Sequence, residues 1–262
     1  RRMGVEIRCD FVVGRTRPLR KLLDEDGYDA VFVGTGAGLP LFMDIPGENL
    51  VGVFSANEYL TRVNLMKAYD HAADTPVLRG RRVAVLGGGN VAMDAARTAR
   101  RLDADLVMIV YRRSDQEMPA RREEVLHAQE EGIEFRYLTN ATRIFGDEFG
   151  KVTGLECLKY QLGEPDEKGR RKPVPIAGSE HRIDVDTVVV AIGNSSNPLI
   201  RQTTDGLTVN QRGNITADAD GRTSIPGVYA GGDIVRGAAT VILAMGQGRT
   251  AAAAINRQLA GG

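Results

Sequence analysis

The 262-residue sequence predicts an α/β protein built on a parallel β-sheet. Strand-like and helical patterns alternate between residues 81 and 132, which is typical of strands joined by crossover helices. A glycine-rich turn at 87–89 follows a buried strand and opens a helix. A second glycine pair, at 231–232, ends another apolar strand near the C-terminus. Together these observations favour a Rossmann-like fold.

Composition and charge exclude several classes of function. The 34 Lys and Arg residues balance 34 Asp and Glu residues, so the charge indicates neither nucleic acid nor an anionic membrane as a partner. No apolar run approaches the length of a membrane span. The first residues, RRMGVEIRCD, lack the apolar region of a secretory signal. Two distant cysteines and three scattered histidines predict neither a disulfide framework nor a metal site, and reduced thiols fit a cytoplasmic protein.

The first eighty residues contain four predicted elements. Their expected ranges are 5–13 and 28–36 for strands, and 18–26 and 55–72 for helices. The first helix is expected to stop at Gly27. The second begins at Ser55, and Glu58 follows at the spacing of a capping box, in which each side chain bonds a free N–H group of the helix start.

The middle of the chain carries the alternating pattern. Its predicted strands are 81–89 and 105–113, and its predicted helices are 90–102 and 118–132. Strand-like runs follow at 134–146, 151–162 and 181–193. We expect the polar stretch 163–173 to be a solvated hairpin loop, and the chain to end with a strand at 227–232 and a helix at 238–259.

The turn at 87–89 predicts a complete dinucleotide site. Gly87, Gly89 and Ala92 form a G-x-G-x-x-A pattern. The first glycine permits a tight turn, the second lets the backbone approach a pyrophosphate, and the small third residue lets the helix lie close to the sheet. The helix N-terminus presents unpaired N–H groups to the phosphates. The predicted binding residues are Gly87, Gly88, Gly89, Asn90, Val91 and Ala92. The alternative is a glycine-rich turn that binds nothing.

The end of the following strand indicates which dinucleotide binds. An acidic residue there would bind the ribose 2′-hydroxyl of NAD. This chain has Arg112, Arg113 and Ser114 instead, and two guanidinium groups with a hydroxyl suit a 2′-phosphate. We therefore predict NADPH (NADP) as the ligand. The alternative is that the arginines only solvate the end of the strand.

Four stretches of the chain resemble the pyridine-nucleotide–flavin oxidoreductases, in particular the small (beta) subunits of NADPH-dependent glutamate synthase. They are GTGAGLPLFMDIPGENLVGVFSANEYL, GGGNVAMDAART, YRRSDQEMPARREE and GVYAGGDIVRGAATVILAMGQGR. The resemblance covers essentially the whole chain. It implies an NADPH-binding domain at residues 80–194, inserted in an FAD-binding domain formed by residues 1–79 and 195–262.

The same resemblance implies a flavin site near the C-terminal glycine pair. Asp233 would accept hydrogen bonds from ribityl hydroxyls, and N–H groups at the start of the last helix would face the pyrimidine edge of the flavin. Other implied residues lie in two strand-to-turn segments where such chains cross between domains. The implied set is Thr35, Gly36, Gly193, Gly232, Asp233, Ala239 and Thr240.

The activity implied by the resemblance is hydride transfer from NADPH to FAD, followed by electron transfer through iron–sulfur centres. The partner would be the glutamate synthase large subunit or another iron–sulfur electron acceptor. No catalytic acid, base or nucleophile is expected, because the cofactors supply the reactivity. The alternatives are a ferredoxin–NADP oxidoreductase or sulfide dehydrogenase subunit of the same family, and a non-catalytic NADPH-binding module.

The sequence departs from that family at its N-terminal end. The family's first glycine motif, which grips the FAD pyrophosphate, is absent from these residues. We therefore expect the sequence to be a C-terminal fragment whose FAD site is incomplete. Such a fragment is expected to bind flavin weakly and to be inactive alone.

Overall fold

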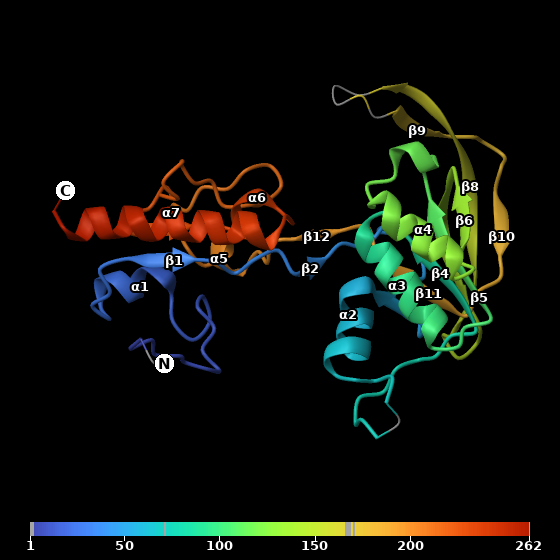
Figure 1. The fold of residues 1–262 in the computed structure, drawn as a ribbon, viewed down its shortest axis with the longest axis horizontal. Coiled ribbons are helices and arrows are strands. Elements are labelled where there is room, and N and C mark those ends of the chain that lie inside the picture. The colour runs from blue at the N-terminus through green and yellow to red at the C-terminus, as the bar shows by residue number, and fades with distance from the viewer. Residues whose placement is uncertain (1–2, 71, 166–168, 170, 262) are drawn as a thin grey trace. The chain divides into compact units, whose positions relative to one another are not determined.

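The computed structural model describes residues 3–70, 72–165, 169 and 171–261. The chain forms two compact units. Residues 1–39 and 194–262 form the first, here called the terminal unit, and residues 40–193 form the second, here called the inserted unit. The inserted unit begins after Leu39, so it includes residues 40–79, which the sequence analysis placed with the FAD-binding domain. Figure 1 gives the element labels used below.

A five-stranded parallel sheet forms the centre of the inserted unit. In spatial order its strands are β3 (Val53–Ser55), β11 (Thr187–Val190), β4 (Arg82–Leu86), β5 (Leu106–Tyr111) and β6 (Glu134–Tyr137). Val85 of β4 lies between Val189 and Ile109 of its two neighbours. The strand β3 forms one edge, which is why the segment before Gly80 belongs to this unit.

Helices cover one face of this sheet. They are α2 (Ala56–Leu60), the π-helical turn η1 (Thr61–Leu65), α3 (Asn90–Arg101) and α4 (Arg122–Glu130) (Figure 1). Because side chains alternate along a strand, Val83 and Val85 of β4 point to this face and pack against buried alanines of α3. Tyr59 of α2 is buried in the same cluster. The result is one continuous core between the helices and the sheet.

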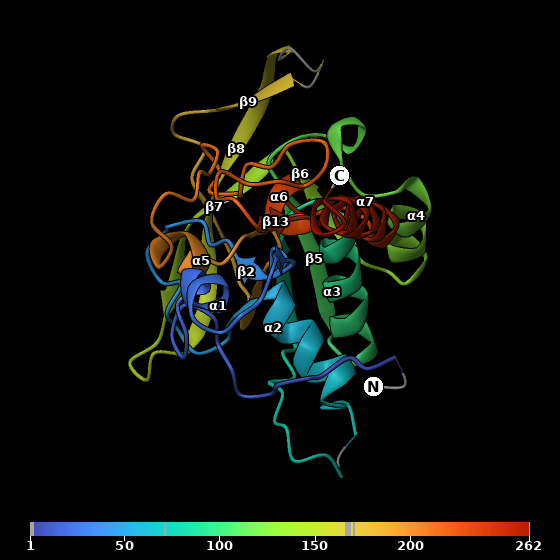
Figure 2. The same ribbon diagram turned by 90° about the vertical axis from the view of Figure 1, so that its left-hand side faces the viewer.

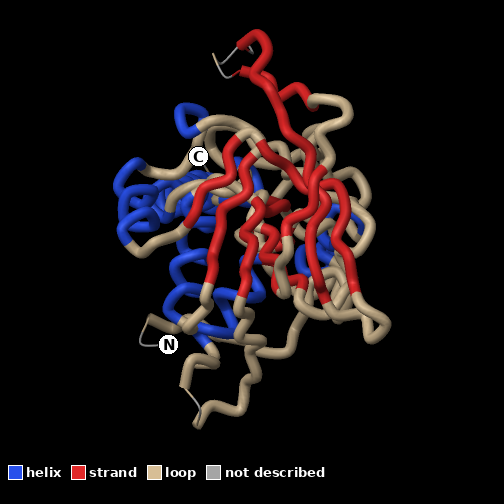
Figure 3. The backbone as a smooth tube through the Cα atoms, turned by 90° about the vertical axis from the view of Figure 1, so that its right-hand side faces the viewer, coloured by secondary structure: helices blue, strands red, loops and turns tan. Residues whose placement is uncertain are grey.

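An antiparallel sheet covers the other face. Its strands are β7 (Thr139–Gly146), β8 (Val152–Pro165), β9 (Arg171–Pro175) and β10 (His181–Ile183). Figure 3 draws all strands of the chain in red. The second set of alternating residues, including Ala84 and Leu86 of β4, packs against Leu155 and Cys157 of β8. The parallel sheet is therefore buried on both faces, as expected for strands that read as continuous apolar runs.

The terminal unit contains a two-stranded parallel sheet and four helices within the described residues. These are β1 (Val31–Val33), β13 (Val228–Ala230), α1 (Leu19–Asp24), α5 (Leu199–Gln202), α6 (Asp233–Arg236) and α7 (Val241–Leu259). Tyr229 of β13 packs against Ala251 and Ala254 of α7, which Figure 2 shows end-on. The Tyr229 hydroxyl donates to Gln258 at 2.6 Å, so this buried tyrosine is both packed and hydrogen-bonded. A further short pair, β2 (Leu39–Pro40) and β12 (Asn194–Ser195), completes the topology of the chain.

Several predicted elements differ from the observed ones. The strand predicted at 5–13 was wrong, because these residues are irregular, and Val5 and Ile7 are 59% and 60% exposed. The helix predicted at 55–72 ends with η1, shortly before Lys67 adopts a φ of 54° that no α-helix allows. Ser55 caps this helix through the Glu58 N–H group at 3.1 Å, while the Glu58 carboxylate pairs with Arg62 and does not complete the box.

The predicted loop at 163–173 also differs from the structure. Strand β8 continues to Pro165, and β9 begins at Arg171 and pairs back along it. Residues 166–168 and 170 of the predicted loop lie outside the described residues. The last helix begins at Val241, three residues later than predicted. No helix in the described parts of the chain is long and apolar enough to cross a membrane.

Candidate dinucleotide-binding site

The turn between β4 and α3 has room for a side chain on one side only. Gly87 has a φ of 145°, and a Cβ atom there would lie 2.3 Å from the Ala191 carbonyl oxygen. A Cβ atom on Gly88 would lie 2.7 Å from the Tyr111 ring. A Cβ atom on Gly89 would meet nothing within 4 Å. The turn is therefore packed tightly against the protein at its first two glycines and open at the third.

The same turn presents a row of unpaired backbone donors. The Gly87 N–H group donates to the Val110 carbonyl at 3.1 Å. Among the described residues, no acceptor lies in hydrogen-bonding range of the next four N–H groups, at residues 88–91. Gly89 caps the 12-residue helix α3 without a side-chain hydrogen bond. Four N–H groups at a helix N-terminus carry a partial positive charge, so this turn is suited to binding a pyrophosphate.

Small residues let α3 lie close to the sheet. Ala92 is fully buried, and it begins a buried stripe that continues through Ala95, Ala96 and Ala99. These side chains pack against the apolar face of β4 and β5. Because α3 begins at Asn90, directly after Gly89, the positive end of the helix dipole lies at the glycine turn.

The loop after β5 lies directly beside the glycine turn. The Ala120 N–H group donates to the Gly88 carbonyl at 3.1 Å, and the Arg121 N–H group donates to Asn90 Oδ1 at 2.8 Å. The predicted ligand Asn90 therefore uses its side-chain oxygen to hold the start of α4. Because β4 and β5 are parallel neighbours, their two loops emerge at the same edge of the sheet.

The three residues predicted to bind a 2′-phosphate have different surroundings. Arg112 is exposed and has no side-chain partner among the described residues. Arg113 is half-buried, and its Nε donates to the Arg171 carbonyl at 3.0 Å, while its two terminal nitrogens have no partner in the described part of the chain. Ser114 donates its hydroxyl to the Glu117 carboxylate through a short hydrogen bond. The arginine end groups are thus available to an anion, and the serine hydroxyl hydrogen is used within the loop.

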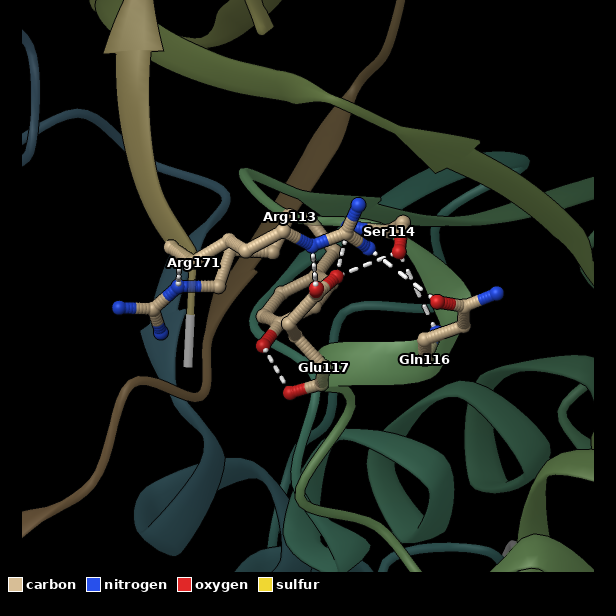
Figure 4. Close-up of polar contacts among 6 residues, drawn as sticks. Arg113, Ser114, Gln116, Glu117 and Arg171 are labelled. Atoms are coloured by element: carbon tan, nitrogen blue, oxygen red, sulfur yellow. Dashed lines mark hydrogen bonds and ion pairs between the residues drawn. The ribbon is translucent and has the colours of Figure 1, made fainter. Parts of the chain in front are cut away.

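Two residues that the sequence analysis missed anchor this loop (Figure 4). Glu117 ends the 3-10 helix η2 (Asp115–Glu117), and its side chain is 8% exposed. Arg171 of β9 places its Nε 2.6 Å from Glu117 Oε1 and donates to the Gln116 side chain at 3.2 Å. Burial alone would raise the pKa of Glu117, but bonds from Ser114 and Arg171 and the charge of Arg171 outweigh it and lower the pKa. The loop is therefore held by an ionised, nearly buried carboxylate.

The residues implied for a flavin site lie mostly at one edge of the terminal unit. Thr35 and Gly36 follow β1, and Gly232 and Asp233 follow its parallel neighbour β13. A Cβ atom on Gly36 would meet nothing within 4 Å, so the edge is open there. The Asp233 carboxylate accepts from the Ala239 N–H group at 3.3 Å through one oxygen. The other oxygen has no partner among the described residues, and it fits a hydroxylated ligand.

The remaining implied residues have structural roles of their own. Thr240 caps α7 by accepting from the Leu243 N–H group at 3.4 Å. The Ala239 N–H group is engaged by Asp233 and is not free for a flavin. Gly193 is the last residue of the inserted unit, has a φ of 114°, and accepts from Leu41 at 3.0 Å through its carbonyl.

A parallel sheet whose glycine turn opens a helix at the carboxyl end of a strand defines a Rossmann-type α/β protein. The site at its edge has the donors that dinucleotide phosphates require. The chain belongs to the pyridine nucleotide-disulphide oxidoreductase family, whose sequence profile matches residues 8–248.

Relatives from two named organisms have similar sequences over nearly the whole chain. The glutamate synthase [NADPH] small chain of Halomonas elongata is 39% identical over 255 residues, which cover 95% of this chain and 53% of that one. The NADP(+)-dependent formate dehydrogenase subunit beta of Moorella thermoacetica is 41% identical over 261 residues, which cover 98% and 35%. The chain thus spans about half of the first relative and about a third of the second.

A solved structure has the same fold. Mycobacterium tuberculosis FprA, in complex with NADPH, superposes with a TM-score of 0.75 at 23% identity. The match covers 95% of this chain and 67% of that one. At this identity the likeness extends to the fold alone.

Proposed function

We propose that this chain is the NADPH-binding part of a flavin oxidoreductase of the glutamate synthase small-subunit type. The inserted unit would bind NADPH, and the terminal unit would form part of an FAD-binding domain. The reaction would be hydride transfer from NADPH to FAD, followed by electron transfer through iron–sulfur centres. Family membership and the 39% identical glutamate synthase small chain support this proposal.

The observation that supports the proposal is that two groups of hydrogen-bond donors without partners among the described residues lie at one edge of the sheet. The free N–H groups of residues 88–91 would bind the pyrophosphate. Arg112 and Arg113, at the end of the neighbouring strand, would bind the 2′-phosphate. A charge-assisted hydrogen bond contributes about 1.5–3 kcal/mol, and about 1.4 kcal/mol is tenfold in affinity. One or two such bonds would favour NADPH over NADH by roughly ten- to a hundredfold or more.

The residues of this chain would bind and orient the cofactors and would not act as acids or bases. FAD, when bound, supplies the hydride-accepting chemistry. In the terminal unit, the free oxygen of Asp233 would accept from a flavin hydroxyl, and the open backbone at Gly36 would allow close approach. In the inserted unit, the glycine turn and the two arginines would hold NADPH at its phosphates.

The double substitution Arg112→Ala with Arg113→Ala tests the assignment of NADPH. We expect NADPH binding to weaken by about tenfold if one charge-assisted contact is lost and by roughly a hundredfold or more if two are lost. NADH binding should be nearly unchanged, since NADH has no 2′-phosphate. Titration of each nucleotide followed by its nicotinamide fluorescence measures both affinities.

A matched control removes two arginines at the opposite edge of the sheet, where the parallel strands begin. Arg81 and Arg82 precede or begin β4, so Arg81→Ala with Arg82→Ala should leave both affinities unchanged. Equal losses for NADPH and NADH in the Arg112/Arg113 variant would remove the phosphate role from these residues.

The formate dehydrogenase relative supports an alternative electron acceptor. The 41% identical chain is a subunit of an NADP(+)-dependent formate dehydrogenase, so the same NADPH-binding part could serve an acceptor other than the glutamate synthase large subunit. Glutamine-dependent NADPH oxidation by the full-length protein with its partner separates the two. Oxidation that requires glutamine and 2-oxoglutarate supports glutamate synthase, whereas oxidation independent of both supports another iron–sulfur acceptor.

A further inference from the structure

Arg171 contacts the candidate 2′-phosphate loop in two ways (Figure 4). Its main-chain carbonyl accepts from Arg113 Nε at 3.0 Å. Its side-chain Nε donates to Glu117 Oε1 at 2.6 Å. Strand β9 therefore holds the loop after β5 at both ends of the stretch 113–117, although it lies more than fifty residues further along the chain.

The bond to the carbonyl restricts the orientation of the Arg113 guanidinium. A guanidinium is planar and its Nε points away from its fork, so a hydrogen bond from Nε limits the directions in which the two terminal nitrogens can point. Among the described residues these terminal nitrogens have no partner. The group is thus anchored through its inner nitrogen and open at its fork, which is the arrangement that a phosphate bound by two parallel hydrogen bonds needs.

Glu117 requires Arg171 because its carboxylate is nearly buried. Its side chain is 8% exposed, and one oxygen accepts from both the hydroxyl and the N–H group of Ser114. The other oxygen faces Arg171. Removing one partner of a buried ion pair leaves an uncompensated charge, which strongly destabilises the local arrangement. The side chain of Arg171 therefore stabilises the turn on which the loop is built.

We infer that Arg171 and Glu117 are positioning residues for 2′-phosphate recognition. They hold Arg113 and the loop 112–117 in the geometry that selects NADPH, and neither of them needs to touch the dinucleotide. The inference rests on the proposed function, because it assigns the specificity of the same site.

Two fragments of the cofactor provide the test. The probe 2′,5′-ADP carries the 2′-phosphate and 5′-AMP lacks it, so their affinities for the 262-residue chain measure phosphate recognition without flavin or turnover. For Arg171→Ala we expect about three- to tenfold weaker binding of 2′,5′-ADP and unchanged binding of 5′-AMP. Calorimetric titration gives both dissociation constants.

A control variant separates positioning from loss of positive charge. Lys172 is the exposed neighbour of Arg171 on β9, so Lys172→Ala removes one positive charge from the same strand without touching the loop. We expect it to change either affinity by less than about twofold. Losses of 2′,5′-ADP affinity that are equal in Lys172→Ala and Arg171→Ala would overturn the inference.

Glu117→Gln distinguishes positioning from charge by the sign of its effect. Removing a negative charge near the phosphate would strengthen 2′,5′-ADP binding if charge alone mattered. Positioning predicts weaker binding, because the carboxamide places an N–H donor against Ser114 or Arg171. Tighter binding would therefore contradict the inference. Glu117→Gln preserves the shape of the side chain. It therefore distinguishes positioning from charge even if circular dichroism shows that Arg171→Ala is not folded.

The binding results distinguish a wrong positioning role from a wrong NADPH assignment. If the unmodified chain does not prefer 2′,5′-ADP to 5′-AMP, the NADPH assignment itself is contradicted. If the unmodified chain has that preference and folded Arg171→Ala and Glu117→Gln retain it in full, only the positioning role is contradicted.

Discussion

Gly87 and Gly89 have different physical reasons to be glycine, although they share one motif. Gly87 has a positive φ and lies against the Ala191 carbonyl, so a side chain there is excluded by the protein itself. Gly89 has a φ of −90°, which any residue adopts, and nothing lies within 4 Å of its missing Cβ. The first glycine therefore serves folding, and the second serves the approach of a ligand.

Alanine substitutions at these two positions should separate stability from binding. We expect Gly87→Ala to lower the free energy of unfolding by at least about 2 kcal/mol, because the new Cβ both clashes and occupies a strained conformation. Gly89→Ala should keep the stability to within about 1 kcal/mol and weaken NADPH binding. Urea denaturation and nucleotide titration of both variants measure the two effects. Unchanged NADPH binding by Gly89→Ala, or unchanged stability of Gly87→Ala, would contradict this division.

At the scale of elements, the parallel sheet is buried on both faces by different partners. Odd and even residues of β4 and β5 enter two separate cores, one against helices and one against the antiparallel sheet. Cys157 of β8 lies in the second core and is fully buried. Burial, with the added charge of Glu156, raises the pKa of Cys157 to about 12. Its thiol is therefore protonated and sterically covered at neutral pH.

Thiol labelling tests this second core. Cys9 is exposed and Cys157 is buried, so a water-soluble disulfide reagent at about pH 8 should modify one thiol per chain rapidly. The second thiol should react only after denaturation, because its reaction needs both access and the thiolate. Counting modified thiols by absorbance, with and without denaturant, gives the result. If both thiols react equally fast in the native chain, the core between the parallel and antiparallel sheets must open readily.

Most elements could be predicted from the sequence because their signals are local. Continuous apolar runs located β4, β5 and β11, and glycine marked the ends of the strands and helices around 87 and 132. The strand predicted at 5–13 failed because alternation shows that a segment could pair, and it does not show that a neighbouring strand exists. The edge strand β3 has only three residues, too few to carry a periodic signal, and its membership of the inserted unit depends on long-range pairing with β11.

The residues of the candidate site also divide into those with a local sequence signal and those without one. The glycine turn and the two arginines follow from short motifs beside predicted strands. Glu117 carries a local signal, since Ser114 three residues earlier forms a capping box that the structure contains. Arg171 has no such signal, because its contact with Glu117 joins residues 54 positions apart. Side chains that position a site from a distant strand become visible only when the fold is known.

At the scale of the whole molecule, the chain is a discontinuous unit with a second unit inserted in it. The residues predicted for NADPH all lie in the inserted unit, and those implied for a flavin lie in the terminal unit, apart from Gly193. Most residues of each set lie at the carboxyl ends of parallel strands, where α/β proteins bind their ligands. This separation supports the proposed division of labour, with one cofactor held by each unit.

A crystal structure of the chain with NADP+ would show directly whether the inserted unit binds the dinucleotide as proposed. We expect the pyrophosphate on the N–H groups of residues 88–91, and the 2′-phosphate within hydrogen-bonding distance of Arg112 or Arg113. An adenosine ribose that lies beside neither arginine would contradict this assignment, and with it the choice of NADPH as the cofactor and the proposed hydride transfer from NADPH.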